Sequence, residues 1–167
     1  MKLLMLFCLL AAGQMQAQKV DIEFDESADF SHYKTFAIQE GQLNAKAPAL
    51  NSELTRKKID NEIRKRLMEK GLMEVSAKPD LNVRFTLGSA RRSEVEAYPA
   101  GWRGLATRRV RVAYTEGTLV INLRDTSKRE LVWRAIAVED KSDPAKISEH
   151  LDDMVRKSIE KYPPKKK

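Results

Sequence analysis

Two stretches of this chain alternate apolar and polar residues with a period of two, and they constrain the fold more than any other feature. Residues 81–87 read LNVRFTL, so their apolar side chains share one face of an extended strand. Residues 117–135 read GTLVINLRDTSKRELVWRA, in which two alternating runs flank a polar turn at residues 125–128. An antiparallel pair would place the apolar side chains of both runs on one face. We therefore expect Trp133 to lie in a packed core, with Arg134 on the opposite face as a candidate surface contact.

The first of two predicted helices lies within residues 51–70. Ile59, Ile63 and Leu67 recur every four residues and form its buried stripe. Asn51 or Ser52 is its candidate N-cap. The opposite face is basic with two apolar residues among the cations, and it consists of Leu54, Lys57, Lys58, Arg64, Lys65 and Met68. A solvated face explains this ridge, and the two apolar residues leave a partner or membrane surface as the alternative.

The second predicted helix begins at Asp143-Pro144, an N-cap followed by proline at the first helical position. Its buried stripe consists of Ile147, Leu151, Met154, Val155, Ile159 and Tyr162. Further strands are expected within residues 20–24, 33–38 and 110–114, with a hairpin turn at residues 115–117. We predict an α+β fold in the order β-β-α-β-β-β-β-α. In it a mainly antiparallel sheet of four to six strands carries both helices on one face.

The N-terminus predicts export. Residues 1–17 read MKLLMLFCLLAAGQMQA, with a positive charge at Lys2, an apolar region and a small residue at the end. This pattern is typical of a secretory signal peptide, and the apolar region is well short of the ~20 residues that span a bilayer. Cleavage is expected after Ala17, with Gly13 as the alternative. We expect a periplasmic or envelope-associated protein with no transmembrane segment after signal removal, in which residues 18–164 form one domain and residues 165–167 a basic tail.

Cys8 is the only cysteine, and it lies inside the apolar region of the predicted signal. A lipoprotein signal would place its cysteine at the end of that region, so lipidation is the minor alternative. Without Cys8 the processed chain has no cysteine. Disulfides, thiolate metal sites and cysteine nucleophiles are thereby excluded.

Five segments of the chain are distinctive, and they read DFSHYKTFAI, IDNEIRKRLMEKGL, KPDLNVRF, EGTLVINLRDTSKRELVWRAIA and IEKYPP. In this order they resemble the opening, the first helix and three later segments of a bacterial extracytoplasmic family, the domain of unknown function 4136. The resemblance extends over about residues 20–164. It implies the fold and an extracytoplasmic location, and many members look like lipoproteins, but it supplies no catalytic residues.

The formal charge of +7 favours anionic partners. Residues 88–107 (GSARRSEVEAYPAGWRGLAT) and residues 39–50 are predicted loops because of their glycine and proline residues. Basic and aromatic side chains gather in the first of these loops, and a solvated loop explains them without a partner. If they bind one, the export signal favours an envelope protein, a glycan or an anionic surface over nucleic acid. The candidate partner-binding residues are Arg91, Arg92, Tyr98, Trp102, Arg103 and Arg134.

No catalytic constellation is predicted. His150 and Asp153 have i, i+3 spacing on a helix, but a metal site needs about three protein ligands and spacing suggests no third. His32 precedes a strand and is expected at the surface, and Ser127 lacks the context of a nucleophile. We therefore predict no cofactor, no metal and no catalytic residue.

Two functions remain as hypotheses. The first is a non-enzymatic binding or structural module of the cell envelope. The second is a hydrolase that acts on an envelope polymer through carboxylates assembled by the fold. A pocket with two converging acids would favour the hydrolase, and an open sheet face with a basic and aromatic rim would favour the module.

Overall fold

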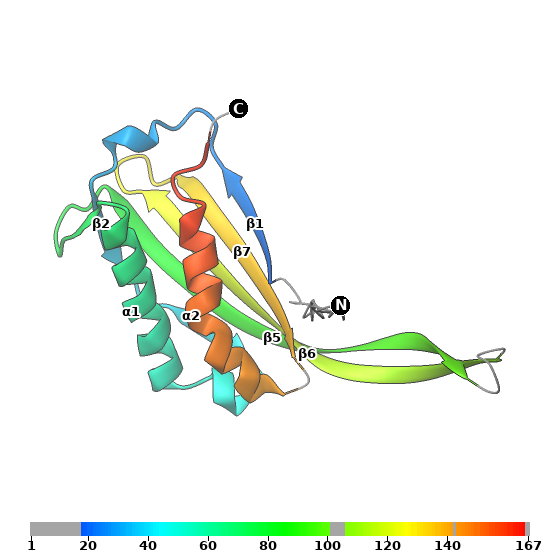
Figure 1. Ribbon diagram of the computed structural model, residues 1–167. Helices are drawn as coiled ribbons and strands as arrows, with labels where there is room; N and C mark the ends of the chain where they lie inside the picture. Colours follow the sequence, from blue (N-terminus) through cyan, green and yellow to red (C-terminus); the bar gives the residue numbers. More distant parts are fainter. Residues whose placement is uncertain (1–17, 101–105, 142, 166–167) are drawn as a thin grey trace, which may run out of the picture.

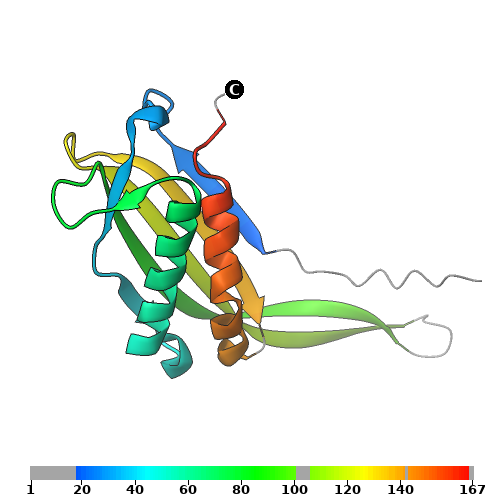
Figure 2. The same ribbon diagram turned by 60° about the vertical axis from the view of Figure 1, so that its left-hand side comes forward.

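The computed structural model describes residues 18–100, 106–141 and 143–165 (Figure 1). Between residues 94 and 114 it describes the side chains of Arg109, Arg111 and Ala113 alone. The predicted signal peptide, the last two lysines of the basic tail and two candidate contacts, Trp102 and Arg103, lie outside the described residues. Two helices cover one face of a single sheet (Figures 1 and 2), as predicted for an α+β fold.

The described strands form one seven-stranded sheet in the order β1-β7-β6-β5-β2-β4, and β3 also pairs with β5. Their bounds are Lys19–Phe24 (β1), Thr35–Ile38 (β2), Gln42–Ala45 (β3), Met73–Glu74 (β4), Leu81–Ala100 (β5), Ala106–Asp125 (β6) and Leu131–Lys141 (β7). Strands β1, β5, β6 and β7 pair antiparallel, whereas β2 and β3 run parallel to β5. The sheet is therefore mixed and larger than the four to six strands expected, because two short segments join its β5 side. One of them, β3, lies in the predicted loop at residues 39–50.

Helix α1 (Glu53–Glu69) begins where its sequence predicts. Ser52 is the N-cap, and its hydroxyl accepts a hydrogen bond of 3.1 Å from the backbone N–H of Thr55. The predicted stripe of Ile59, Ile63 and Leu67 is fully buried. On the basic ridge, Leu54 and Met68 are 78% and 55% exposed.

Helix α2 (Pro144–Glu160) also starts at its predicted cap. The Asp143 carboxylate accepts a hydrogen bond of 2.9 Å from the backbone N–H of Ala145, and Pro144 occupies the first turn. The apolar stripe from Ile147 to Ile159 is buried against the sheet and against α1. Both predicted helices are thus confirmed, and each supplies an apolar face to the same core.

Trp133 belongs to that core and is fully buried as predicted. Its ring meets the ring of Tyr162 edge to face, with centroids 5.7 Å apart. Tyr162 in turn contacts Phe30 at 5.8 Å, so the aromatic contacts link the sheet to the segment after α2 and to the segment before β2. Such edge-to-face pairs add to the hydrophobic stabilisation of each ring. The run of residues 117–135 is scaffold on its helix-facing side.

The prediction of a loop at residues 88–107 is wrong, because β5 and β6 form a long two-stranded hairpin there, which we call the arm. The two strands pair without interruption from Leu81 opposite Asp125 to Ala100 opposite Ala106. Figures 1 and 2 show this hairpin projecting beyond the helices. Beyond the helices, the strand face that would carry apolar side chains has no core to pack against. The two-residue apolar pattern of a half-buried strand is therefore lost there, although the backbone pairing of β5 and β6 continues.

The hairpin turn expected at residues 115–117 is also wrong, because these residues continue β6. Gly117 is buried there beneath α2. A Cβ atom at this position would lie 2.7 Å from Cγ2 of Ile147. The glycine therefore serves close packing of helix on strand rather than a turn.

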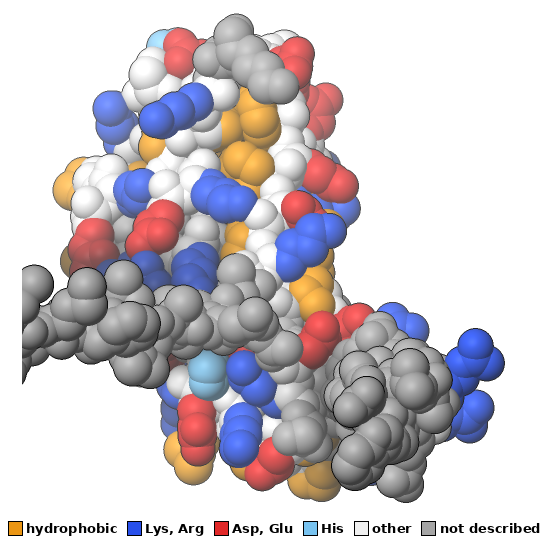
Figure 3. All heavy atoms as spheres, turned by 45° about the vertical axis from the view of Figure 1, so that its right-hand side comes forward, with side chains coloured by type: hydrophobic (Ala, Val, Ile, Leu, Met, Phe, Trp, Pro, Cys, Tyr) orange, Lys and Arg blue, Asp and Glu red, His pale blue; other side chains and the backbone are white. Residues whose placement is uncertain are grey.

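Strand β1 forms one edge of the sheet and carries the half-buried Val20, Ile22 and Phe24 against the core. The ammonium group of Lys161, just after α2, donates a hydrogen bond to the backbone carbonyl of Val20. Figure 3, which views this side of the molecule, shows a narrow strip of hydrophobic side chains with charged residues on both sides. A lysine placed on an edge carbonyl is one way in which proteins limit strand addition at an edge.

Candidate functional site

The sheet face opposite the helices is covered by none of the described elements. Alternation along the strands places Asn82, Arg84, Asn122, Arg124 and Arg134 on this face, since their neighbours in sequence point into the core. Arg84 stands directly opposite Asn122, and Asn82 opposite Arg124. Across the next pair of strands, Asn122 stands opposite Arg134. Arginine and asparagine therefore alternate across three adjacent strands.

A shallow hollow of about 320 Å³ lies on this face. It is lined by two guanidinium groups and three carboxamides, those of Gln39, Asn82, Arg84, Asn122 and Arg124. Both arginine side chains are exposed, whereas the two asparagines are half-buried. We refer to this set of five residues as the arginine–amide hollow.

Hydrogen bonds orient the two asparagines of the hollow. The Nε2 amide of Gln39 donates to Oδ1 of Asn82 at 3.1 Å. The Nε of Arg134 donates to Oδ1 of Asn122 at 2.8 Å. Each asparagine thus uses its carbonyl oxygen internally, which leaves its NH₂ group as the part able to meet a ligand.

The guanidinium groups differ in how they are held. Nη2 of Arg124 donates to the backbone carbonyl of Arg129 at 3.0 Å. Nη1 of Arg134 lies 3.5 Å from a carboxylate oxygen of Glu23 on β1. Arg84 makes no hydrogen bond or ion pair with any residue that the structure describes. The placement of Arg134 opposite the core is as predicted, and its role in binding stays a prediction.

On the arm, the structure describes the side chains of only some of the predicted contact residues. Arg91 and Arg92 are exposed near its base, and Nη2 of Arg92 lies 3.1 Å from Oε1 of Glu116. Tyr98 belongs to the described backbone of β5, but its side chain lies outside the described residues. Arg109 and Arg111 are exposed on β6.

The arm arginines and Arg134 do not form one cluster. Arg91 stands opposite Thr115 on β6, whereas Arg134 stands opposite Asn122. Those positions are separated by about 24 Å along the strand at the usual rise per residue. The predicted partner-binding residues therefore divide into two regions, the arm and the sheet face. The arginine–amide hollow was missed in the sequence because its five residues come from two strands, β5 and β6, and from Gln39 just after β2.

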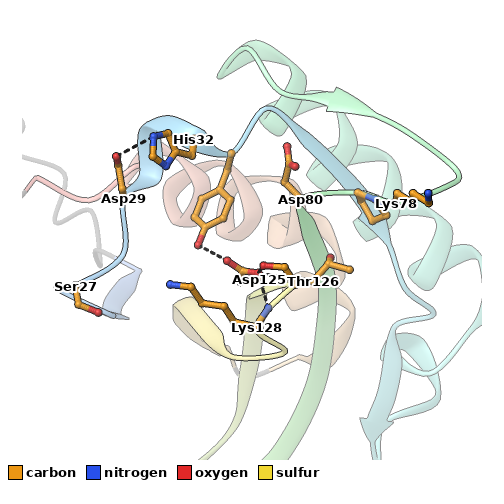
Figure 4. A pocket seen from close by; sticks show the side chains of 11 residues that line it. Ser27, Asp29, His32, Lys78, Asp80, Asp125, Thr126 and Lys128 are labelled. Carbon is orange, nitrogen blue, oxygen red and sulfur yellow. Dashed lines mark hydrogen bonds and ion pairs between the residues drawn. The ribbon is translucent and has the colours of Figure 1, made fainter.

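A second hollow of about 600 Å³ lies at the opposite end of the sheet from the arm, and three carboxylates line it, those of Asp29, Asp80 and Asp125 (Figure 4). Asp80 accepts hydrogen bonds from the backbone N–H groups of Lys34 and Thr35 at 2.9 and 2.8 Å, and from the Thr35 hydroxyl at 2.8 Å. The N–H donated by Lys34, followed by the bonds from Thr35, lowers the pKa of Asp80. Figure 4 shows this carboxylate directed away from Asp125.

Asp125 organises the turn between β6 and β7. Its Oδ1 accepts hydrogen bonds from the N–H groups of Ser127 and Lys128 and from the Ser127 hydroxyl, at 2.7 to 2.9 Å. These bonds, that of Lys128 first, lower the pKa of Asp125 to about 2. Its Oδ2 accepts a hydrogen bond from the Tyr33 hydroxyl at 3.0 Å. A carboxylate so fully occupied holds the turn and is poorly suited to give or take a proton near neutral pH.

The histidines do not form the contacts that their spacing suggests. Nδ1 of His150 lies 3.5 Å from the buried carboxylate of Glu139, while Asp153 pairs with Arg156 at 2.7 Å. His32 is exposed and lies 3.3 Å from Asp29. Across the described part of the chain, no three potential metal ligands come together. Nor does that part contain a helix long and apolar enough to cross a membrane.

Solved structures share this fold at low sequence identity. A PDZ domain protein from Parabacteroides distasonis matches with a TM-score of 0.61 and 19% identity over 89% of this chain, which spans 36% of that protein. A DUF4136 family protein from Bacteroides thetaiotaomicron matches with a TM-score of 0.52 and 12% identity, covering 87% of this chain and 96% of the other. A PelC dodecamer from Paraburkholderia phytofirmans gives 0.51 and 12%, covering 86% and 95%.

No curated protein matches the chain at a significant level. The family model described as Domain of unknown function (DUF4136) matches residues 20–164, from the first residues of β1 to the proline pair after α2. The motifs that resemble this family in the sequence occupy the strands and helices of the core that the structure describes. The chain therefore belongs to the DUF4136 family.

Proposed function

We propose that this protein is an exported, non-enzymatic module that binds an anionic component of the cell envelope through its open sheet face. The observation that carries this proposal is the arginine–amide hollow, where Arg84 and Arg124 stand exposed beside carboxamides on a face that no described element covers. Unmatched guanidinium groups attract anions and bind carboxylates or phosphates through paired N–H donors.

Export is supported by the amino-acid pattern of residues 1–17. Strand β1 begins at Lys19, two residues after the expected cleavage site at Ala17, and the family match begins at residue 20. We expect the processed protein in the periplasm or at the envelope. Fractionation of the source cells with N-terminal sequencing tests this, and a full-length chain in the cytoplasm would contradict it.

The binding role is favoured over hydrolysis by the protonation behaviour of Asp80 and Asp125, two of the acids that line the second hollow. Asp80 and Asp125 both have lowered pKa values, and backbone and hydroxyl donors surround both carboxylates. A general acid needs a raised pKa and a free proton, so neither group fits that role. A polymer-degrading activity that Asp125→Asn abolishes while the protein stays folded would favour the hydrolase instead.

The experiment for the binding role captures envelope extract on the immobilised protein. The double variant Arg84→Gln, Arg124→Gln should retain less material than the wild type, and high salt should reduce wild-type retention because exposed charges are screened. Arg109→Gln, Arg111→Gln is the matched control, since it removes the same charge from the arm. Equal retention by the wild type and the sheet-face variant would contradict the proposed site.

A further inference from the structure

We infer that the arginine–amide hollow recognises the carboxylate-bearing sugar units of an acidic polysaccharide. This inference rests on the proposed binding function and names the ligand class for the same face. It depends on three features of the hollow: its excess of hydrogen-bond donors, the planar shape of its cations, and the apolar pair beside it.

The first feature is that the hollow offers donors and almost no acceptors. Oδ1 of Asn82 accepts from Gln39, and Oδ1 of Asn122 accepts from Arg134, so the NH₂ group is the part of each asparagine that stays available as a donor to a ligand. No carboxylate lines the hollow among the residues that the structure describes. A ligand that fits must supply several acceptor oxygens and negative charge.

The second feature is that the charge comes from guanidinium groups on a paired sheet. Arg84 and Asn122 are direct cross-strand neighbours, whose Cβ atoms lie about 5 Å apart in such pairs. A planar carboxylate can meet one guanidinium edge and one amide NH₂ at that separation. The backbone N–H groups beneath them belong to the strand ladder, so the floor provides no N–H nest of the kind that commonly binds phosphate.

The third feature suits a sugar ring. Val120 and Ile136 stand opposite each other on the same face, two residues from Asn122 and Arg134, and both are half-buried. The C–H surface of one sugar ring can lie on such a pair. Asn82 stands opposite Arg124, four residues along β6 from Val120 and therefore about 14 Å away, so its carboxamide and that of Gln39 would meet the hydroxyl groups of a neighbouring sugar in the same chain. A chain of acidic sugars would therefore find charge, amide and apolar contacts side by side.

The test is calorimetric titration of the purified protein with polygalacturonate at low salt. Fully methyl-esterified polygalacturonate has the same backbone without charge and should bind at least about tenfold more weakly, since a charge-assisted pair contributes at least that much. The double variant Arg84→Gln, Arg124→Gln should lose about tenfold or more in affinity. Asn122→Asp, which keeps the acceptor for Arg134 but replaces the NH₂ donor with a charged oxygen, should lose a similar factor. Thermal unfolding of each variant shows whether the fold is intact.

Arg109→Gln, Arg111→Gln is the control, with affinity for polygalacturonate expected within a factor of about two, as for substitutions remote from a site. Equal affinity for the esterified polymer would overturn the inference, and so would an unchanged affinity of the folded Arg84→Gln, Arg124→Gln variant. Dextran sulfate, polyphosphate or single-stranded DNA binding as tightly as polygalacturonate would also overturn it, by showing a surface without preference for carboxylates. If polygalacturonate does not bind while capture of envelope material still depends on Arg84 and Arg124, the inferred ligand class is wrong and the proposed function stands.

Discussion

The hydroxyl group of Tyr33 donates a hydrogen bond of 3.0 Å to Oδ2 of Asp125, although the two residues are 92 positions apart in the sequence. Tyr33 precedes β2 on one side of the sheet, and Asp125 ends β6 in its middle. Oδ1 of Asp125 holds the turn through Ser127 and Lys128. The same carboxylate therefore stabilises both a local turn and the contact with Tyr33, which is distant in the sequence.

Tyr33→Phe should reduce the free energy of unfolding by about 1 kcal/mol, the usual net worth of such a hydrogen bond. Tyr162→Phe is the matched control, because the buried hydroxyl of Tyr162 has no hydrogen-bond partner among the residues that the structure describes. Its removal should be neutral or slightly stabilising. Urea unfolding at neutral pH measures both, and equal losses in the two variants would show that the contact with Asp125 is not stabilising.

The pH dependence of stability follows from the pKa values of the same pair. The pKa of Asp125 is lowered to about 2, so its contribution is present above the unfolded value of about 3.9 and is lost as pH falls from about 4 to about 2. Asp125→Asn should therefore be less stable than the wild type at pH 7, and this difference should shrink toward pH 2. A difference that stays constant between pH 7 and pH 2 would show that the ionised carboxylate of Asp125 does not stabilise the fold.

At alkaline pH, the contribution of Tyr33 to stability changes in the opposite direction and decreases as pH rises. Burial, followed by its hydrogen bond to Asp125, raises the pKa of Tyr33 to about 12. Its contribution is present below the unfolded value of about 10 and is lost as pH rises to about 12. The difference in stability between the wild type and Tyr33→Phe should therefore decline over that range, as measured by urea unfolding at each pH.

Trp133→Ala should cost about 3–5 kcal/mol, as for other fully buried large side chains. Trp133→Phe is the control, since it keeps a ring against Tyr162 and loses an indole N–H that has no hydrogen-bond partner in the described part of the chain. It should cost clearly less than the alanine variant. An alanine variant that loses well under about 1 kcal/mol, the range of surface substitutions, would show that the core does not depend on Trp133.

The core was predictable from the sequence because each of its parts is marked by local periodicity. The stripe from Ile59 to Leu67, the cap at Asp143 and the buried face around Trp133 all lie where 3.6-residue and two-residue patterns place them. Periodicity reports which side chains are buried, so it fails where a strand has no buried face. That is why the arm at residues 88–107 was mistaken for a loop, and why Gly117 was mistaken for a turn residue.

The candidate site was less predictable than the core. Arg134 was identified because it alternates with Trp133, but Arg84 and Arg124 stand out only once β5, β6 and β7 are in register. A cross-strand arrangement depends on strand order and register, and a single sequence gives neither directly. The arginine–amide hollow is a product of that pairing.

Gly41→Ala should destabilise the protein, by about 1–3 kcal/mol as for other overpacked cores. A Cβ atom at Gly41 would lie 2.1 Å from the ring of Phe85, which is fully buried. Gly88→Ala is the matched control, because a Cβ atom there meets nothing within 4 Å. Thermal unfolding that shows the same midpoint for both variants would contradict the close packing at Gly41.

Replacing Arg91, Arg92 and Arg103 together with serine separates the arm from the sheet face as binding surfaces. Arg91 and Arg92 are exposed, and the ion pair of Arg92 with Glu116 is a surface pair. Exposed substitutions usually change stability within about 0.5 kcal/mol each, so the melting temperature should move little.

If the arm contacts the anionic partner, retention of captured envelope material should fall, and raised salt should reproduce that fall in the wild type because exposed charges are screened. Equal retention by the wild type and the triple variant at both low and high salt would remove the arm from the binding surface. Equal retention is the result that the proposed site on the sheet face around Arg84 and Arg124 predicts, and the basic ridge of α1 is the next candidate if the sheet-face variant also binds normally.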